Sequence, residues 1–166
     1  MTSRVPGLRI KYQRGAVAVE AAICMAFILV PLLALILLFG RYFWYYTAAQ
    51  KAAHDAATFL ASAPLSEIKN AGAAGFATNI IGWETGDLDA STIETLSPTA
   101  ICGYRIPASS TYISWYECNS TGTPVAVRGG VVMTVADPFF SPITRGILGV
   151  NGLPIFVGVN MRYVGR

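Results

Sequence analysis

Histidine is nearly absent from this chain of 166 residues, which carries a single one at position 54. Serine and cysteine nucleophiles usually depend on a histidine base, and zinc sites draw on histidine or on several cysteines. His54 and Asp55 are adjacent on a predicted helix, so we expect their side chains to point in different directions into solvent. The sequence therefore predicts no enzyme, metal site or cofactor, and no small-molecule substrate.

Charge is also scarce, because only 13% of the residues are charged whereas 54% are apolar. An ordinary soluble domain has about 25% charged residues. Four basic residues precede the first long apolar run, and residues 41–166 hold equal numbers of acidic and basic residues. These four are Arg4, Arg9, Lys11 and Arg14. The basic excess therefore belongs to a short tail, and a nucleic-acid partner is excluded.

Residues 21–40 contain no charged side chain and read AAICMAFILVPLLALILLFG. A helix of 20 residues is about 30 Å long, which is enough to cross a bilayer. Because basic residues collect on the cytoplasmic side of such helices, we expect the N-terminus inside and residues 41–166 outside. The aromatic run Tyr42–Tyr46 is predicted to lie at the membrane interface, the alternative being a place in the core of the external domain.

Two common processing routes fit this segment poorly. The apolar run exceeds the 7–15 residues of an ordinary signal peptide core. Cys24 follows a bulky Ile23 and precedes most of the apolar run, which disfavours a lipoprotein, so we expect Cys24 to be a small buried residue of the span.

Glu20 places an ionisable group at the start of the apolar helix, which costs free energy in a membrane. One interpretation is that its side chain reaches the headgroups and has no further role. The other begins with a cut after Gly15, which would make Ala16 the new N-terminus and Glu20 the fifth residue. The carboxylate could then pair with a protonated N-terminal amine, its own or that of a neighbour.

The segment RGAVAVEAAICMAFILVPLLALILLFGRYFWYYTAAQKAAHDAA has the basic leader, glycine, glutamate and apolar helix of type IV prepilins. It most closely resembles the TadE-like pseudopilins of tight-adherence (Flp) pilus systems, over residues 14–63. Pro31 matches the proline of their apolar run and is expected to kink the helix. A weaker resemblance lies in VVMTVADPFF, and Ala21 stands where the family usually has Phe or Tyr.

The resemblance implies a pilin-like structural subunit of the bacterial inner membrane, with its C-terminal domain in the periplasm or in an extracellular pilus. It implies that a prepilin peptidase cuts between Gly15 and Ala16, and that Glu20 acts in assembly. The implied partners are the pilus assembly platform, other pilin-like subunits and membrane lipid. The alternative is an uncleaved, single-pass accessory protein of a secretion or pilus machine.

Small residues recur at helical spacing beyond the apolar run, from Ala48 to Leu60. We expect this stripe to seat the helix on the chain's own domain, although a partner helix is the alternative. Ala18, Ala22 and Ala26 have the spacing that favours a partner helix in the membrane. The predicted organisation is a leader over 1–15, a transmembrane helix over 16–40, its exported continuation over 41–63 and an exported domain over 64–166.

Residues 64–166 predict an α+β fold in which the long helix packs on a small antiparallel sheet. A second helix is expected over 65–81, with Gly82 as its stop. Short β-like runs predict three to five strands. The candidates are Thr92–Leu96, Thr99–Ile106, Thr111–Cys118, Gly130–Ala136 and Ile155–Val164.

Cys102 and Cys118 lie in neighbouring strand candidates and are the two cysteines beyond the membrane segment. In an oxidising compartment they could form a disulfide that contributes about 3 kcal/mol. Two reduced cysteines in the core are the alternative.

Overall fold

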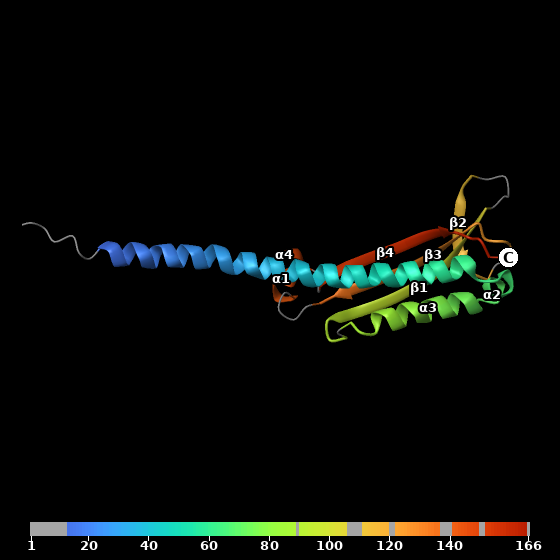
Figure 1. Ribbon diagram of the computed structural model, residues 1–166, viewed down its shortest axis with the longest axis horizontal. Coiled ribbons are helices and arrows are strands. Elements are labelled where there is room, and N and C mark those ends of the chain that lie inside the picture. Colours follow the sequence, from blue (N-terminus) through green and yellow to red (C-terminus); the bar gives the residue numbers. More distant parts are fainter. Residues whose placement is uncertain are drawn as a thin grey trace, which may run out of the picture. The chain divides into compact units, whose positions relative to one another are not determined.

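The computed structural model describes residues 13–88, 90–105, 111–119, 122–136, 141–149 and 152–165 (Figure 1). It divides into two compact units, Met1–Gly40 and Arg41–Arg166, which we call the N-terminal and C-terminal units. Residues 1–12, most of the predicted leader, lie outside the described residues. The elements run α1 (Gln13–Ser62), α2 (Leu65–Lys69), α3 (Gly72–Thr85), β1 (Ile93–Arg105), β2 (Ile113–Glu117), β3 (Ala126–Val135), α4 (Ser141–Leu148) and β4 (Leu153–Arg162).

Helix α1 is continuous from the apolar run into the alanine-rich stretch, as the sequence predicts. Its last residue, Ser62, lies two positions before Pro64. The residue before a proline avoids helical dihedrals, which explains why the helix ends here. Proline is tolerated inside α1 at Pro31.

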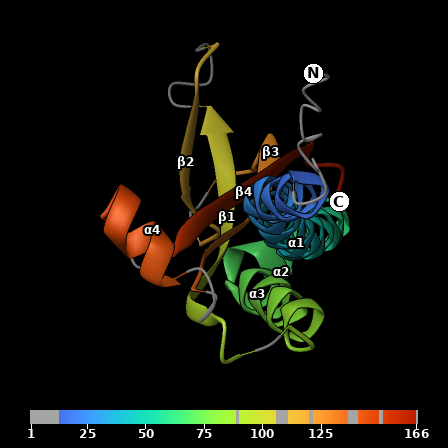
Figure 2. The ribbon, with the colours of Figure 1, turned by 90° about the vertical axis from the view of Figure 1, so that its left-hand side faces the viewer.

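The C-terminal unit contains one antiparallel sheet with the strand order β2-β1-β3-β4. The C-terminal part of α1 and α3 lie on one face of this sheet (Figure 2). The predicted α+β fold, a long helix packed on a small antiparallel sheet, is confirmed.

Strand β1 corrects the prediction of two separate strands before residue 106. It runs through Pro98 without interruption, whereas Ile106 lies outside the described residues. Strand β2 pairs only with residues 101–105, so Pro98 has a neighbouring strand on one side, β3. Proline has no N–H to donate, and strands accept it where the nitrogen faces an open edge.

The predicted second helix is also wrong in its details. The chain forms two helices, α2 and α3, separated at Asn70 and Ala71, and α3 passes Gly82 to end at Thr85. Ala71 has a φ of 57°, in the left-handed region that breaks a helix. Gly72 and Gly75 weaken the prediction of a single helix, but the residue that takes the left-handed conformation is the alanine before them.

Helix α4 was not predicted. Pro142 occupies its first turn, where the backbone N–H needs no helical partner. Its short length and its proline and glycine resemble a turn, so periodicity could not identify it.

The alanine stripe of α1 forms the centre of the core, which confirms the preference for the chain's own domain over a partner helix. Its fully buried residues are Ala49, Ala52, Ala53, Ala56, Ala57 and Leu60. Gly129 of β3 faces this stripe so closely that an added Cβ would overlap the carbonyl oxygen of Ala53. Small residues on both sides therefore let the helix backbone approach the sheet.

Tyr45 changes the interpretation of the aromatic run. It is only 3% exposed, and its hydroxyl is hydrogen-bonded to the hydroxyl of Thr92. Tyr42 is partly buried against the same core, whereas Phe43 and Trp44 are exposed. Tyr45 therefore belongs to the core, in contrast to the prediction of an interfacial position. Phe43 and Trp44 lie on the surface.

Candidate functional site

The described part of the N-terminal unit is residues 13–40, and between Gly15 and Gly40 nearly all of its large apolar side chains are exposed. They include Val17, Val19, Ile23, Met25, Phe27, Ile28, Leu29, Val30, Leu32, Leu33, Leu35, Ile36, Leu37 and Phe39. An exposed apolar surface of this extent marks a site of contact with membrane or protein. Among the described residues, one helix is long and apolar enough to cross a membrane.

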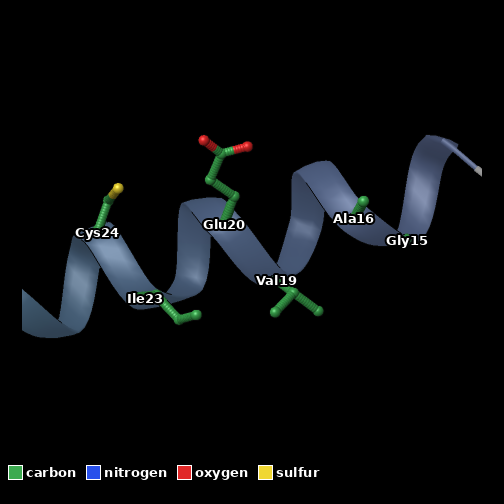
Figure 3. Close-up of a pocket in the computed structure, with 6 residues that line it drawn as sticks. All are labelled: Gly15, Ala16, Val19, Glu20, Ile23 and Cys24. Carbon is green, nitrogen blue, oxygen red and sulfur yellow. The ribbon is translucent and has the colours of Figure 1, made fainter.

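Glu20 is the single charged residue between Gly15 and Gly40. Figure 3 shows its carboxylate projecting from the same side of the helix as Ala16 and Cys24, one turn before and one turn after. Val19 and Ile23 project from the other side. The carboxylate therefore stands on a face with small neighbours, which leaves room for another group beside it.

Gly15 and Ala16, the predicted processing site, lie at the start of this face. Among the described residues, nothing lies within 4 Å of the position that a Cβ on Gly15 would take, and Ala16 is exposed. Cys24 is exposed as well, because the N-terminal unit supplies no core to bury it.

Pro31 lies inside α1, where it cannot donate to the carbonyl oxygen of Phe27 one turn earlier. The kink expected at this position stays a prediction.

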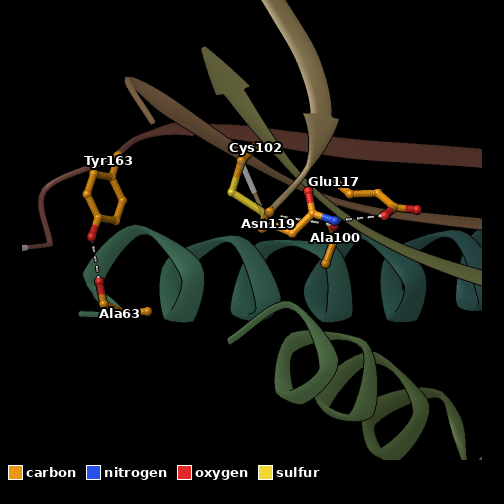
Figure 4. Close-up of a disulfide and its surroundings, with 7 residues drawn as sticks. Ala63, Ala100, Cys102, Glu117, Asn119 and Tyr163 are labelled. Carbon is orange, nitrogen blue, oxygen red and sulfur yellow. Dashed lines mark hydrogen bonds between the residues drawn. A yellow bond between two sulfur atoms is a disulfide. The ribbon is translucent and has the colours of Figure 1, made fainter. Parts of the chain in front are cut away.

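Cys102 and Cys118 are joined by a disulfide in the C-terminal unit (Figure 4), with an S–S distance of 2.12 Å and a Cα–Cα distance of 5.0 Å. Cys102 belongs to β1, and Cys118 directly follows β2. Both side chains are buried. The bond fastens the short edge strand β2 to the rest of the sheet.

His54 and Asp55 lie closer together than expected, since His54 Nδ1 is 3.4 Å from Asp55 Oδ1. Both side chains are nevertheless exposed on α1. Over the described ranges, no group of three or more His, Cys, Asp or Glu residues could hold a metal ion.

Two polar contacts of the C-terminal unit have no sequence signal. The Lys51 ammonium donates to the Glu84 carboxylate, and this hydrogen bond raises the pKa of Lys51. Burial raises the pKa of Tyr163, whose hydroxyl donates to the carbonyl oxygen of Ala63. Both contacts join residues far apart in the sequence, so only the fold reveals them.

An exposed apolar helix followed by a small, disulfide-bonded α+β unit defines a protein of the membrane-anchor class. Residues 15–58 match the family model described as TadE-like protein. The resemblance seen in the sequence is confirmed for this segment, which begins at Gly15 and ends within α1. No curated protein and no solved structure matches the chain.

The TadE-like match indicates a Tad pilus-associated protein with an N-terminal membrane helix. The TadE-like family is a structural, pilus-associated family. It also suggests interaction with other pilus components.

Proposed function

We propose that this chain is a pilin-like structural subunit (a pseudopilin) for assembly of a tight-adherence or Flp-type pilus. The observation that carries the proposal is Glu20, the one charge on an otherwise apolar, exposed helix within a TadE-like segment. A prepilin peptidase would cut between Gly15 and Ala16, on the cytoplasmic side of the inner membrane. The open space that a Cβ on Gly15 would meet among the described residues supports access to that bond.

Glu20 would act in assembly once the leader is removed. A carboxylate costs about 2.5–3.5 kcal/mol at the centre of a bilayer and less near its edge. Pairing with the new amine of Ala16 lowers that cost. Ala16 and Glu20 are four residues apart and neighbours on one helix face, so the partner can be the chain's own amine or that of an adjacent subunit.

The proposed topology places the leader in the cytoplasm and the C-terminal unit in the periplasm or in the pilus. The disulfide between Cys102 and Cys118 supports this orientation, because disulfides persist in oxidising compartments. The proposed partners are the prepilin peptidase, the assembly platform, other pilin-like subunits and inner-membrane lipid.

An uncleaved accessory anchor is the second candidate. Ala21 favours it, since this position usually carries Phe or Tyr in the resembling proteins. Both candidates use the same membrane helix, and they differ in the fate of residues 1–15.

The mass of the intact protein, extracted from membranes of cells with a working prepilin peptidase, tests the proposal. We expect a chain that begins at Ala16, and a full-length chain for Gly15→Leu. Gly40→Leu is the matched control, because both glycines lie in α1 with open space around them. A wild-type chain that keeps residues 1–15 supports the accessory anchor instead.

Glu20→Ala tests the assembly role separately. We expect it to insert into the membrane normally but to reduce pilus formation. Cys24→Ser is the control, because it changes a polar group one turn later on the same side of the helix. Unchanged pilus formation in Glu20→Ala would remove the role assigned to the carboxylate.

A further inference from the structure

A hollow of about 370 Å³ opens on the helical face of the C-terminal unit, where the end of α1 meets α2 and α3. Phe59, Pro64, Glu67 and Phe76 are among the residues that line it. The rings of Phe59 and Phe76 are in contact at a tilt of 42°, with their centroids 4.9 Å apart, and Phe76 remains 44% exposed. The hollow thus has aromatic walls and a carboxylate at its edge.

The aromatic surface continues along α3 from this hollow. Trp83 contacts Phe76 edge-on, with the ring centroids 5.6 Å apart, and is 65% exposed. Buried aromatic side chains and their pockets supply most of the binding energy of protein interfaces. An exposed aromatic row beside an open hollow therefore fits a contact surface.

The opposite face of the sheet carries an exposed aromatic side chain of its own. Phe156 of β4 is 70% exposed. Phe156 lies two residues before Gly158, and the guanidinium of Arg128 lies over Gly158. Gly129, the residue after Arg128, faces α1 instead. Because side chains alternate along strands, Phe156 and Arg128 share the face that α1 and α3 leave open.

The two faces also differ in charge. Alternation places Arg105, Arg128 and Arg162 on the open face of the sheet, together with Glu117. Within this unit, α1, α2, α3 and the turn after α3 carry Asp55, Glu67, Glu84 and Asp87 against Arg41, Lys51 and Lys69. Lys51 is already hydrogen-bonded to Glu84. One face is therefore net basic and the other net acidic among these described residues, and complementary charges favour association.

We propose that the C-terminal unit binds a second copy of itself, with Phe156 of one copy inserted into the hollow bounded by Phe59, Pro64 and Phe76 of the next. The arginines of the sheet face then meet the carboxylates of the helical face. Both halves of the contact are present on every copy, so the chain itself supplies the partner.

The two surfaces lie on opposite faces of the unit, which determines the kind of assembly. A contact between two different patches is heterologous, and it continues from copy to copy unless rotation closes a ring. The inference therefore deepens the proposed role in pilus assembly by naming the contact between C-terminal units. It can hold or fail independently of leader cleavage.

Cysteine crosslinking of the full-length chain in native membranes tests this contact. The background carries Cys24→Ser, which removes the free thiol. One copy carries Gly75→Cys, beside Phe76 on α3 and with open space around it, and the other carries Phe156→Cys. We expect a product of twice the subunit mass when both copies are co-expressed, and a ladder when one chain carries both changes.

Neither single variant should give a dimer, because position 75 of one copy does not lie beside position 75 of another, and the same holds for position 156. A dimer of Phe156→Cys alone would show a symmetric contact and overturn the proposal. No product between positions 75 and 156, or a product with a different protein, would overturn it as well.

Two charge-changing variants test whether complementary charges contribute to this contact. Arg128→Glu on the Phe156→Cys copy should lower the crosslink severalfold, whereas Lys69→Glu on the Gly75→Cys copy should not lower it. Equal yields in both cases would contradict the charge argument for this orientation.

The outcomes also separate the inference from the proposed function. Leader removal and pili without the crosslink would leave the function standing and reject the docking surface. A crosslink in a chain that keeps its leader would leave the docking surface standing and reject the processing.

Discussion

The hydroxyl of Tyr163 donates a 2.8 Å hydrogen bond to the backbone carbonyl oxygen of Ala63, which joins the residue after β4 to the end of α1 (Figure 4). The backbone N–H groups of Val164 and Gly165 add hydrogen bonds of 2.9 and 3.0 Å to the carbonyl oxygen of Ala61. Carbonyl groups in the last turn of a helix have no helical partner. The C-terminal end of the chain therefore caps α1.

The Tyr163 contact predicts a loss of stability at alkaline pH. Burial raises the pKa of the phenol above its ordinary value of 10.0, so the folded chain keeps this proton longer than the unfolded chain does. The stabilisation is fully present below pH 10.0 and is lost as the pH rises through the folded pKa. Thermal unfolding between pH 8 and 11 should show the decline.

Tyr163→Phe is the control for this pH dependence. At neutral pH it should cost about 1 kcal/mol, because the carbonyl oxygen of Ala63 loses its donor. The stability of this variant should fall less steeply at alkaline pH than the stability of the wild type. Parallel curves would mean that other groups cause the alkaline loss.

Gly129→Ala should destabilise the C-terminal unit by about 3 kcal/mol. Inserting atoms into a tight core typically costs about 1–3 kcal/mol, and the upper end is expected because the added methyl group would overlap the backbone of α1 at Ala53. Gly82→Ala is the matched control, because its Cβ would meet nothing within 4 Å. Chemical denaturation of both variants measures the difference, and equal stabilities would contradict the close approach of α1 to β3.

Ala71→Gly should stabilise the protein by about 1 kcal/mol. Ala71 has a φ of 57°, and L-residues with a Cβ pay about 1–2 kcal/mol in this left-handed region. Glycine adopts it without that cost, although its greater freedom in the unfolded chain offsets part of the gain. Ala74→Gly inside α3 should destabilise instead, which makes it the comparison for the same melting experiment.

Reduction of the disulfide should cost about 3 kcal/mol, since the bond restricts the unfolded chain. The paired change Cys102→Ala with Cys118→Ala should cost at least this much, because it also removes buried side chains. Cys24→Ser is the control and should leave the melting temperature unchanged, since Cys24 is free and exposed. Equal melting temperatures with and without reductant would show that the bond contributes nothing.

The regular periodic parts of the fold could be predicted from the sequence. The alanine spacing after residue 48 identified the buried face of α1, and the alternation from Ile155 to Tyr163 identified β4, because burial on one face fixes both patterns. The TadE-like segment could also be found, since its glycine, glutamate and apolar run are local in the sequence.

The remaining features depend on contacts that no local pattern encodes. Ala71, and not the neighbouring Gly72, takes the left-handed conformation between α2 and α3, and Pro98 lies inside a strand because its neighbour β2 is short. Tyr45 belongs to an aromatic run typical of a membrane interface, yet Thr92, far along the chain, gives its hydroxyl a buried partner. In each case tertiary structure overrides local preference.

The open stretch of β1 has a consequence for how copies of this protein can meet. Within the part of the chain that the structure describes, residues 93–100 have no strand beside them on the β2 side, and such edges invite another chain to add a strand. Pro98 has no N–H in that row of donors, so a strand added at this edge would lack one hydrogen bond. Edge-to-edge pairing of two copies along this stretch of β1 is thereby disfavoured.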